Sequence, residues 1–156
     1  MALDMRIEGL DELLRRVKDP EVMAGPAREY LTRSAQAVET RGRQNSARGQ
    51  TGNLQGRWGS EMDSAQMPQW AAVRNRAPHA HLLELGTKPH FVPAGRLAAW
   101  AAARGLNPYA VARTIAKKGT RPRWMLYRAR KDSSSDFQAL ARDALDQIAR
   151  RLAGER

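Results

Sequence analysis

Apolar residues recur at helical spacing near the start of the chain. Four of them would share one face of a short helix opened by Gly9: Leu10, Leu13, Leu14 and Val17. Residues 19–21 (Asp-Pro-Glu) are a helix-start signal, because Asp can cap a helix and Pro is tolerated in its first turn. A longer helix, kinked or restarted at Pro26, is therefore expected to run into the forties. Before both helices, Met5 and Ile7 alternate with polar residues and are compatible with a short strand.

The pattern changes after the long helix. Residues 41–56 are rich in Gly, Gln, Asn and Arg, and we expect them to form a loop that orders only in an assembly. Leu54, Trp58 and Met62 then recur on an even period, and residues 70–73 (Trp-Ala-Ala-Val) follow after a polar turn. This alternation predicts two strands that pair as a β-hairpin.

Helical patterns return in the second half of the chain. Residues 79–85 are expected to form a short helix ended by Gly86, because glycine readily adopts the backbone conformation found after a helix. Two further helices, residues 96–104 and 108–118, are each followed by a glycine and would form a helical hairpin. Asn107 is expected to cap the second of these helices, which has Pro at its first position.

Two further segments complete the chain. Residues 124–127 (Trp-Met-Leu-Tyr) are a short apolar piece that could pair as a strand or fill a groove. Residues 135–138 (Ser-Asp-Phe-Gln) have the pattern of a capping box, which predicts the start of a final helix. The apolar face of that helix would carry these side chains: Phe137, Leu140, Ala141, Ala144, Leu145, Ile148 and Leu152.

Charge is distributed unevenly along the chain, whose formal net charge is +11. Residues 1–84 carry 12 basic and 11 acidic side chains, and residues 132–156 carry four and five. Residues 85–131 carry no acidic side chain and 11 basic ones: Lys88, Arg96, Arg104, Arg113, Lys117, Lys118, Arg121, Arg123, Arg128, Arg130 and Lys131. A cluster of one sign indicates a polyanionic neighbour or an acidic partner protein, with a solvated arginine-rich surface as the plain alternative. The residues that we expect to face the anion are Lys117, Lys118, Arg121 and Arg123.

Composition limits the chemistry open to this sequence. It contains no cysteine, which excludes a disulfide framework and a thiolate metal site within it. No apolar run reaches about 18 residues, so no transmembrane helix is expected. The first residues lack the basic-then-apolar pattern of a signal peptide, and we expect the protein to be made and used in a cytoplasm.

Catalysis is not expected from the residues. The serines at 133–135 have no histidine near them in sequence, and a loop with a helix cap is the simpler interpretation. There is no Gly-rich phosphate loop and no evident pair of carboxylates for acid–base work. His79, His81 and Glu84 could meet over one helical turn, but a metal site needs three or four converging ligands. We therefore expect no enzyme activity, metal or cofactor.

A helix-turn-helix is an alternative interpretation of residues 97–118. Five positions resemble the small-residue and apolar spacing of that motif: Ala101, Gly105, Leu106, Val111 and Ile115. A helix that reads DNA would present its first residues to base edges, and residues 107–110 (Asn-Pro-Tyr-Ala) are a weak set for this purpose. Arg104 also stands where an apolar residue would normally pack. A plain helical hairpin with a charged outer face remains the competing interpretation.

Four short motifs, in order, resemble a known family. They are Ile7-Glu8-Gly9-Leu10-Asp11-Glu12-Leu13-Leu14, Thr51-Gly52-Asn53-Leu54, Ala77-Pro78-His79-Ala80-His81-Leu82-Leu83-Glu84-Leu85-Gly86-Thr87, and Gly119-Thr120-Arg121-Pro122-Arg123-Trp124-Met125-Leu126. The order is similar to that of the small tail-component (neck or tail-completion) proteins of long-tailed double-stranded DNA phages. Two positions depart from the family pattern, because His79 replaces the usual Tyr and Trp124 the usual Phe. Residues 90–118 look like an inserted basic helical hairpin.

The resemblance implies a single α+β domain over residues 1–156, in which a small antiparallel sheet packs against a long helix and a C-terminal helix. It implies a virion structural protein without catalytic activity, which assembles as a ring at the head-tail junction after synthesis in the host cytoplasm. The implied partners are further copies of the chain, the head connector or stopper, tail-terminator or tail-tube proteins and, non-specifically, packaged DNA. A membrane is not among them. The residues expected to hold turns of the fold are Thr51, Gly52, Glu84, Gly86 and Thr87.

Overall fold

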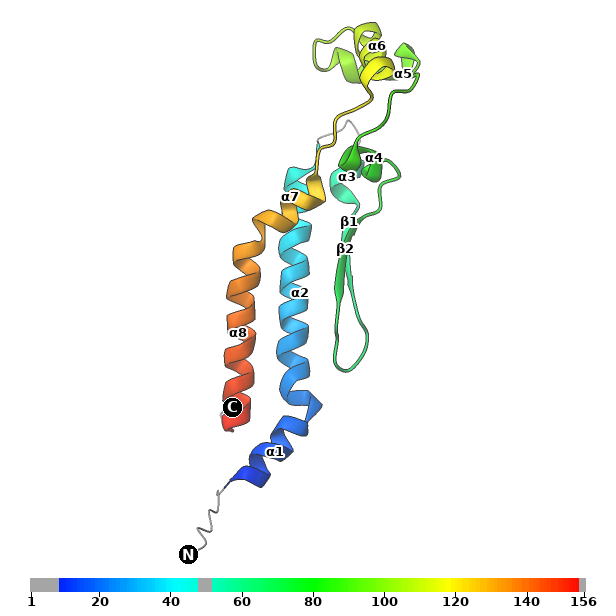
Figure 1. Cartoon of the computed structure of the whole chain (residues 1–156). Coiled ribbons are helices and arrows are strands. Elements are labelled where there is room, and N and C mark those ends of the chain that lie inside the picture. Colours follow the sequence, from blue (N-terminus) through cyan, green and yellow to red (C-terminus); the bar gives the residue numbers. More distant parts are fainter. Residues whose placement is uncertain (1–8, 48–51, 155–156) are drawn as a thin grey trace, which may run out of the picture. The chain divides into compact units, whose positions relative to one another are not determined.

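The computed structural model describes residues 9–47 and 52–154 (Figure 1). Helices dominate this part of the chain, and two strands form a small antiparallel sheet, which confirms the expected α+β class. The elements are α1 (Leu10–Lys18), α2 (Pro20–Asn45), α3 (Asn53–Gly56), β1 (Trp58–Met62), β2 (Ala71–Asn75), α4 (Ala80–Leu85), α5 (Ala94–Ala102), α6 (Pro108–Lys118), α7 (Met125–Asp132) and α8 (Ser134–Ala153). The strand predicted around Met5 and Ile7 lies outside the described residues, as does Thr51.

Contacts between residues group the chain into two compact units. Unit 1 holds the described parts of Met1–Val38, together with Ser60–Val73 and Ser133–Arg156. Unit 2 holds the described parts of Glu39–Gly59 together with Arg74–Asp132. The chain passes from one unit to the other several times, along α2, along the hairpin and between α7 and α8. The expectation of a single domain stays a prediction.

In unit 1, α2 begins as the sequence predicted. The backbone N–H of Glu21 donates to Asp19 Oδ1 at 3.0 Å, so Asp19 caps the helix. Pro26 is buried inside α2, and the helix continues through it without a restart. The core beneath this helix is thin, because its buried side chains are small: Val22, Ala24, Ala35 and Val38.

Polar side chains join α8 to α2. The amide nitrogen Nε2 of Gln147 donates to Glu29 Oε2 at 3.2 Å, and Arg33 Nη1 lies 3.5 Å from Asp143 Oδ2. Arg33 also donates to Glu29 Oε1 at 3.1 Å. The hydrogen bonds from Gln147 and Arg33 hold the pKa of the Glu29 carboxyl below its ordinary value, because both favour the charged carboxylate.

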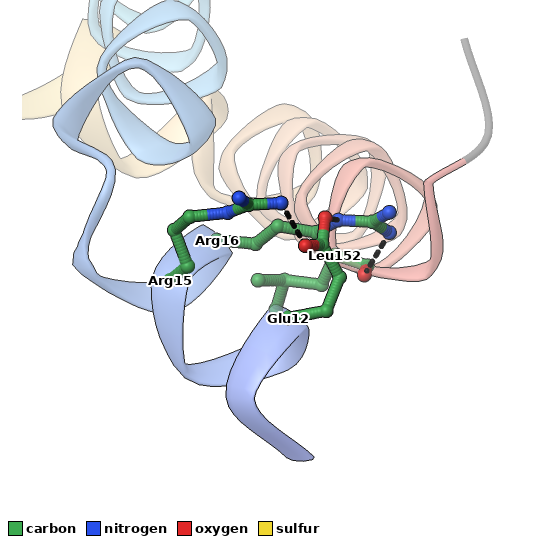
Figure 2. A network of polar contacts seen from close by, with 4 residues as sticks. All are labelled: Glu12, Arg15, Arg16 and Leu152. Carbon is green, nitrogen blue, oxygen red and sulfur yellow. Dashed lines mark hydrogen bonds and ion pairs between the residues drawn. The ribbon is translucent and has the colours of Figure 1, made fainter. Parts of the chain in front are cut away.

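The C-terminus of α8 meets α1 through an arginine (Figure 2). Arg16 Nη1 donates to the carbonyl oxygen of Leu152 at 3.0 Å, while its Nε donates to Glu12 Oε1 at 2.9 Å. Arg15 forms a second ion pair with Glu12. A cation at this position is favourable because the last carbonyl groups of a helix carry partial negative charge.

The predicted apolar faces of α1 and α8 are real but only partly covered. The four apolar residues of α1 (Leu10, Leu13, Leu14 and Val17) are each 44–46% exposed. On α8, Leu145 is 65% exposed.

The predicted start of α8 is wrong. The helix begins at Ser134, after Ser133, which is fully buried and makes no side-chain cap hydrogen bond. The cap position of α8 is therefore Ser133, two residues before the Ser135 of the predicted pattern.

In unit 2, the predicted loop over residues 41–56 is wrong for most of its described part. Residues 41–45 continue α2, and residues 53–56 form α3. The indole Nε1 of Trp58 donates to Ser46 Oγ at 2.8 Å, and Ser46 Oγ donates to the carbonyl oxygen of Gly42 at 2.8 Å. Packing of one buried aromatic ring against the helix therefore outweighs the polar, glycine-rich composition of the segment.

The predicted hairpin is confirmed, with one correction. Strands β1 and β2 pair as expected, but Leu54 lies in α3 and not in the first strand. Its side chain is still buried, and its carbonyl oxygen accepts a hydrogen bond from Asn75 Nδ2 at 2.6 Å. An even period through residues 54, 58 and 62 also fits the spacing of one helical turn, which explains the error.

Candidate functional site

A β-bridge closes the base of the α5–α6 hairpin. Thr87 and Thr120 pair as an antiparallel bridge, with backbone N–H to carbonyl distances of 3.1 and 3.2 Å. Their hydroxyl oxygens lie 3.0 Å apart, and the N–H of Thr120 also lies 3.1 Å from Thr87 Oγ1. A further bond joins His90 N–H to the carbonyl oxygen of Ile115 at 3.4 Å. The α5–α6 hairpin therefore leaves and re-enters the rest of unit 2 at one place.

Two glycines make this close approach possible. Gly119 has φ +70°, and a Cβ added there would lie 1.9 Å from the carbonyl oxygen of Thr87. Gly86 has φ +74°, and its Cβ would lie 2.4 Å from the carbonyl oxygen of Thr120. Both the positive φ and the contact exclude a side chain. Gly86 and Thr87, which we expected to hold a turn, thus hold the crossing of two segments that are distant in sequence.

Glu84 caps the start of α7 from α4. Its two carboxylate oxygens accept hydrogen bonds from the backbone N–H groups of Leu126 at 3.0 Å and Tyr127 at 3.2 Å. Backbone bonds from Arg123 to Leu83 (2.8 Å) and from Trp124 to Glu84 (3.3 Å) reinforce the joint. A carboxylate is well placed at a helix N-terminus, where N–H groups lack partners. Residues 125–127 thus begin α7, so the expected strand is wrong, and the one deeply buried side chain of the segment is Met125.

The remaining residue expected to hold a turn is Gly52. It has φ +63° and lies at the cap position of α3, where its carbonyl oxygen accepts from Gly56 N–H at 3.0 Å. A positive φ is a conformation that glycine adopts without cost. The role of Gly52 in the backbone is therefore clear.

Helix α6 has the predicted caps, whereas α5 spans Ala94–Ala102 and so begins and ends two residues before the predicted bounds of 96–104. Asn107 Oδ1 accepts from the N–H groups of Tyr109 (2.9 Å) and Ala110 (3.4 Å), as the sequence indicated. The guanidinium of Arg104 lies 4.6 Å from the ring centre of Trp100 and donates to the carbonyl oxygen of that residue. Arg104 is exposed, so it stacks on the outside of α5 and does not occupy the core.

All eleven cations of residues 85–131 are exposed. The four that we expected to face an anion lie close in sequence: Lys117 and Lys118 in the last turn of α6, Arg121 and Arg123 in the link to α7. Arg104 has further interactions of its own, and none of the other ten cations forms an ion pair with a carboxylate of the described residues. Cations that lack such a partner are available to an external anion.

The division into units separates charge more sharply than the sequence alone indicated. The sequence of unit 2 contains 17 basic and three acidic residues, a net charge of +14. The sequence of unit 1 contains 10 basic and 13 acidic residues, a net charge of −3. The long helix α2 and the hairpin contribute residues to both units, which is why a count along the chain did not reveal this division.

Two aromatic residues beside the predicted cations were not singled out from the sequence as functional. Trp124 is 43% exposed and Tyr127 is 58% exposed, and their rings meet edge to face with centres 6.2 Å apart. Trp124 has φ +53°, the one positive φ among the described non-glycine residues. A bulky side chain in this region costs roughly 1–2 kcal/mol. The apolar run of residues 124–127 was the available signal, and we interpreted it as a buried element.

The possible metal ligands do not converge. His79 and His81 are exposed, and the Glu84 carboxylate is engaged by the backbone of α7. Across residues 9–47 and 52–154, no group of three His, Cys, Asp or Glu side chains is arranged to hold a metal ion. The same ranges contain no helix with the length and apolarity needed to cross a membrane.

Comparisons with known proteins add no identification. No protein-family model, no curated protein and no solved structure matches the chain significantly.

Proposed function

We propose that this chain is a virion structural protein of a long-tailed phage, which assembles as a ring at the head-tail junction and joins the tail to the head connector. The observation that carries the proposal is the division of charge between the two units, −3 in unit 1 and +14 in unit 2. A subunit with one cationic unit can present it to a polyanion while its other surfaces meet neighbouring subunits.

The exposed face of α1 supports assembly. Leu13 and Leu14 are 45% and 46% exposed, on a helix whose other faces carry charge. A helix with this pattern normally buries its apolar face. A closed ring needs two different, complementary patches on each subunit, and the α1 face offers one apolar patch for such a contact.

The four family-like motifs support the phage assignment. Two of them, around Gly86-Thr87 and Gly119-Thr120, meet in the β-bridge, and Glu84 connects the first to the helix that follows the second. Residues that recur as motifs because they hold the backbone would be expected at such a joint. The inserted hairpin, α5 and α6, then extends from this joint as an addition to the family pattern.

The partners proposed for unit 2 are packaged DNA or an acidic protein of the connector or tail. Lys117, Lys118, Arg121 and Arg123 are the residues that we assign to this contact. Phosphate contacts do not depend on the base sequence. Each phosphate contact makes the affinity fall more steeply as the salt concentration rises.

Electron cryo-microscopy of the phage particle that carries this chain tests the proposal. We expect a ring of density at the head-tail junction into which units 1 and 2 fit, with residues 117–123 facing DNA or an acidic partner. Absence of the chain from purified particles, measured by mass spectrometry, would contradict the proposal. Its presence only in the capsid shell would do the same.

A second candidate function is DNA binding outside the virion through residues 97–118. The observation that favours it is the packed helix pair, with Arg113, Lys117 and Lys118 exposed on α6. Asn107 weakens the case for base reading, because its side-chain oxygen is occupied by the cap. Tight binding of one duplex sequence over random duplex, measured at fixed salt, would select this function.

A further inference from the structure

We propose that residues 121–128 form a binding site for single-stranded nucleic acid, in which Trp124 and Tyr127 stack on unpaired bases and neighbouring arginines contact phosphates. The inference concerns unit 2 alone and does not depend on where in the host or the virion the protein works.

The aromatic pair has the exposure that stacking needs. Trp124 is 43% exposed and Tyr127 is 58% exposed, although their rings are in contact with each other. The planes of the rings make an angle of 67°, so the edge of one meets the face of the other. Each ring therefore retains a face that its neighbour does not cover, and a base can stack on such a face.

The backbone at Trp124 is strained. Trp124 adopts φ +53°, a region that a bulky residue rarely enters. The conformation is held by bonds from Trp124 N–H to the Glu84 carbonyl and from Tyr127 N–H to the Glu84 carboxylate. Trp124 keeps this conformation while 43% of its surface stays exposed, and such strain is found mainly at functional sites.

Cations flank the rings on both sides in sequence. Arg121 and Arg123 precede Trp124, and Arg128 follows Tyr127. All three are exposed and form no ion pair with a described carboxylate. Cationic side chains that alternate with exposed aromatic rings are the combination used by proteins that bind single strands without sequence preference.

The charge around the site favours nucleic acid over a protein partner. Trp, Tyr and Arg also form the centres of protein interfaces. However, residues 85–131 contain 11 basic and no acidic side chains, an imbalance that suits a polyanion better than a mixed protein surface. A single strand is favoured over a duplex, because paired bases are already stacked on each other and expose only their edges.

Binding of the full chain to labelled oligothymidylate of about 16 nucleotides tests the site, with a duplex of the same length beside it. Replacing Trp124 and Tyr127 together by Ala should weaken single-strand binding on the order of tenfold or more, as expected for lost stacking. Duplex binding should change little. Replacing Arg121 and Arg123 by Ala should weaken both and reduce the salt dependence of both.

Two variants separate binding from folding. Trp124→Gly accepts the positive φ without strain, so it should fold at least as stably as the Ala variant and still lose single-strand binding. Trp70→Ala removes a tryptophan of similar exposure (50%) from a segment without basic residues, and it should bind as the parent does.

Three outcomes would overturn the inference. The first is unchanged single-strand affinity in the double aromatic variant, and the second is an equal loss in Trp70→Ala. The third is a parent protein that binds neither the oligothymidylate nor the duplex. Binding of an acidic protein through the same rings, without nucleic acid, would count as this third outcome.

Discussion

The hydroxyl oxygens of Thr87 and Thr120 lie 3.0 Å apart, although 33 positions separate the two residues in sequence. Together with the two backbone hydrogen bonds of the bridge, this contact fixes both ends of the α5–α6 hairpin to one point of unit 2. Stability of the hairpin should therefore depend on residues that lie outside its helices.

Gly119→Ala should disrupt the bridge between Thr87 and Thr120. The added Cβ would lie 1.9 Å from the Thr87 carbonyl oxygen, and φ is +70°. Gly105→Ala is the matched control, because its φ is +64° but nothing lies within 4 Å of its Cβ. We expect the control to cost about 1–2 kcal/mol of unfolding free energy from backbone strain. Gly119→Ala should cost roughly 1–3 kcal/mol more, because the backbone must move.

Chemical denaturation measures the unfolding free energies of the two variants. Amide hydrogen exchange shows which part of the fold is destabilised. Faster exchange in α5 and α6 of Gly119→Ala, without a similar change in Gly105→Ala, is the expected pattern. Equal destabilisation by the two substitutions would mean that the crossing at Thr87 does not hold the hairpin.

Glu84→Ala should destabilise the start of α7. The carboxylate accepts from two backbone N–H groups, and loss of a helix cap costs about 0.5–2 kcal/mol. Glu84→Gln should lose less, because one amide oxygen can still accept one bond. Thermal unfolding of the parent and both variants measures the order of their stabilities. A Glu84→Gln variant that is less stable than Glu84→Ala would contradict the capping role.

Two helical glycines should respond oppositely to alanine. At Gly42 a Cβ would lie 2.8 Å from the Trp58 ring, which is buried and hydrogen-bonded to Ser46, so Gly42→Ala should destabilise by about 1–3 kcal/mol. At Gly95, in the first turn of α5, nothing lies within 4 Å of an added Cβ. Gly95→Ala should be neutral or stabilise by up to about 1 kcal/mol, because alanine favours a helix. Urea denaturation compares the two, and similar signs would contradict the packing at Trp58.

Glu29 should make the α2–α8 contact sensitive to acid. Its pKa is lowered in the fold by hydrogen bonds from Gln147 and Arg33, so its carboxylate stabilises the protein above the ordinary pKa. That contribution is lost as pH falls through the lowered pKa of the folded state. Glu29→Gln should be less stable than the parent near pH 7, with the difference shrinking in acid. Denaturation midpoints at several pH values measure it, and a difference independent of pH would refute the assignment.

The apolar face of α1 should drive self-association if the ring proposal holds. Leu13→Asp places a charge on a face that is already 45% exposed, so it should leave folding nearly unchanged and reduce assembly. Lys18→Asp, on an exposed position of the same helix, is the control. Light scattering coupled to size-exclusion chromatography reports the mass of each. An unchanged mass for Leu13→Asp, in conditions where the parent is oligomeric, would remove α1 from the interface.

The sequence predicted those features that depend on near neighbours. Asn107 caps α6 as its position before Pro108 indicated, and Asp19 caps α2. The errors arise where distant residues decide. Trp58 contacts the polar end of α2 through Ser46, and Glu84 caps the helix that begins at Met125. Neither contact leaves a local pattern in the sequence.

The candidate site shows the same limit. The cationic cluster could be counted along the chain, and its members are exposed as an anion-facing surface requires. The aromatic pair could not be recognised, because an apolar run of four residues usually indicates burial. Trp124 combines exposure with a positive φ and a backbone bond to Glu84 in α4, which lies far away in sequence.

The bridge between Thr87 and Thr120 also has a meaning for protein engineering. Residues paired across an antiparallel bridge have Cα atoms only about 4.5–5.5 Å apart. A tight turn, or another hairpin, could therefore replace the chain between them without moving α4 or α7. Unit 2 offers a site for exchange of the basic hairpin at this point, because the segments on either side keep their paths.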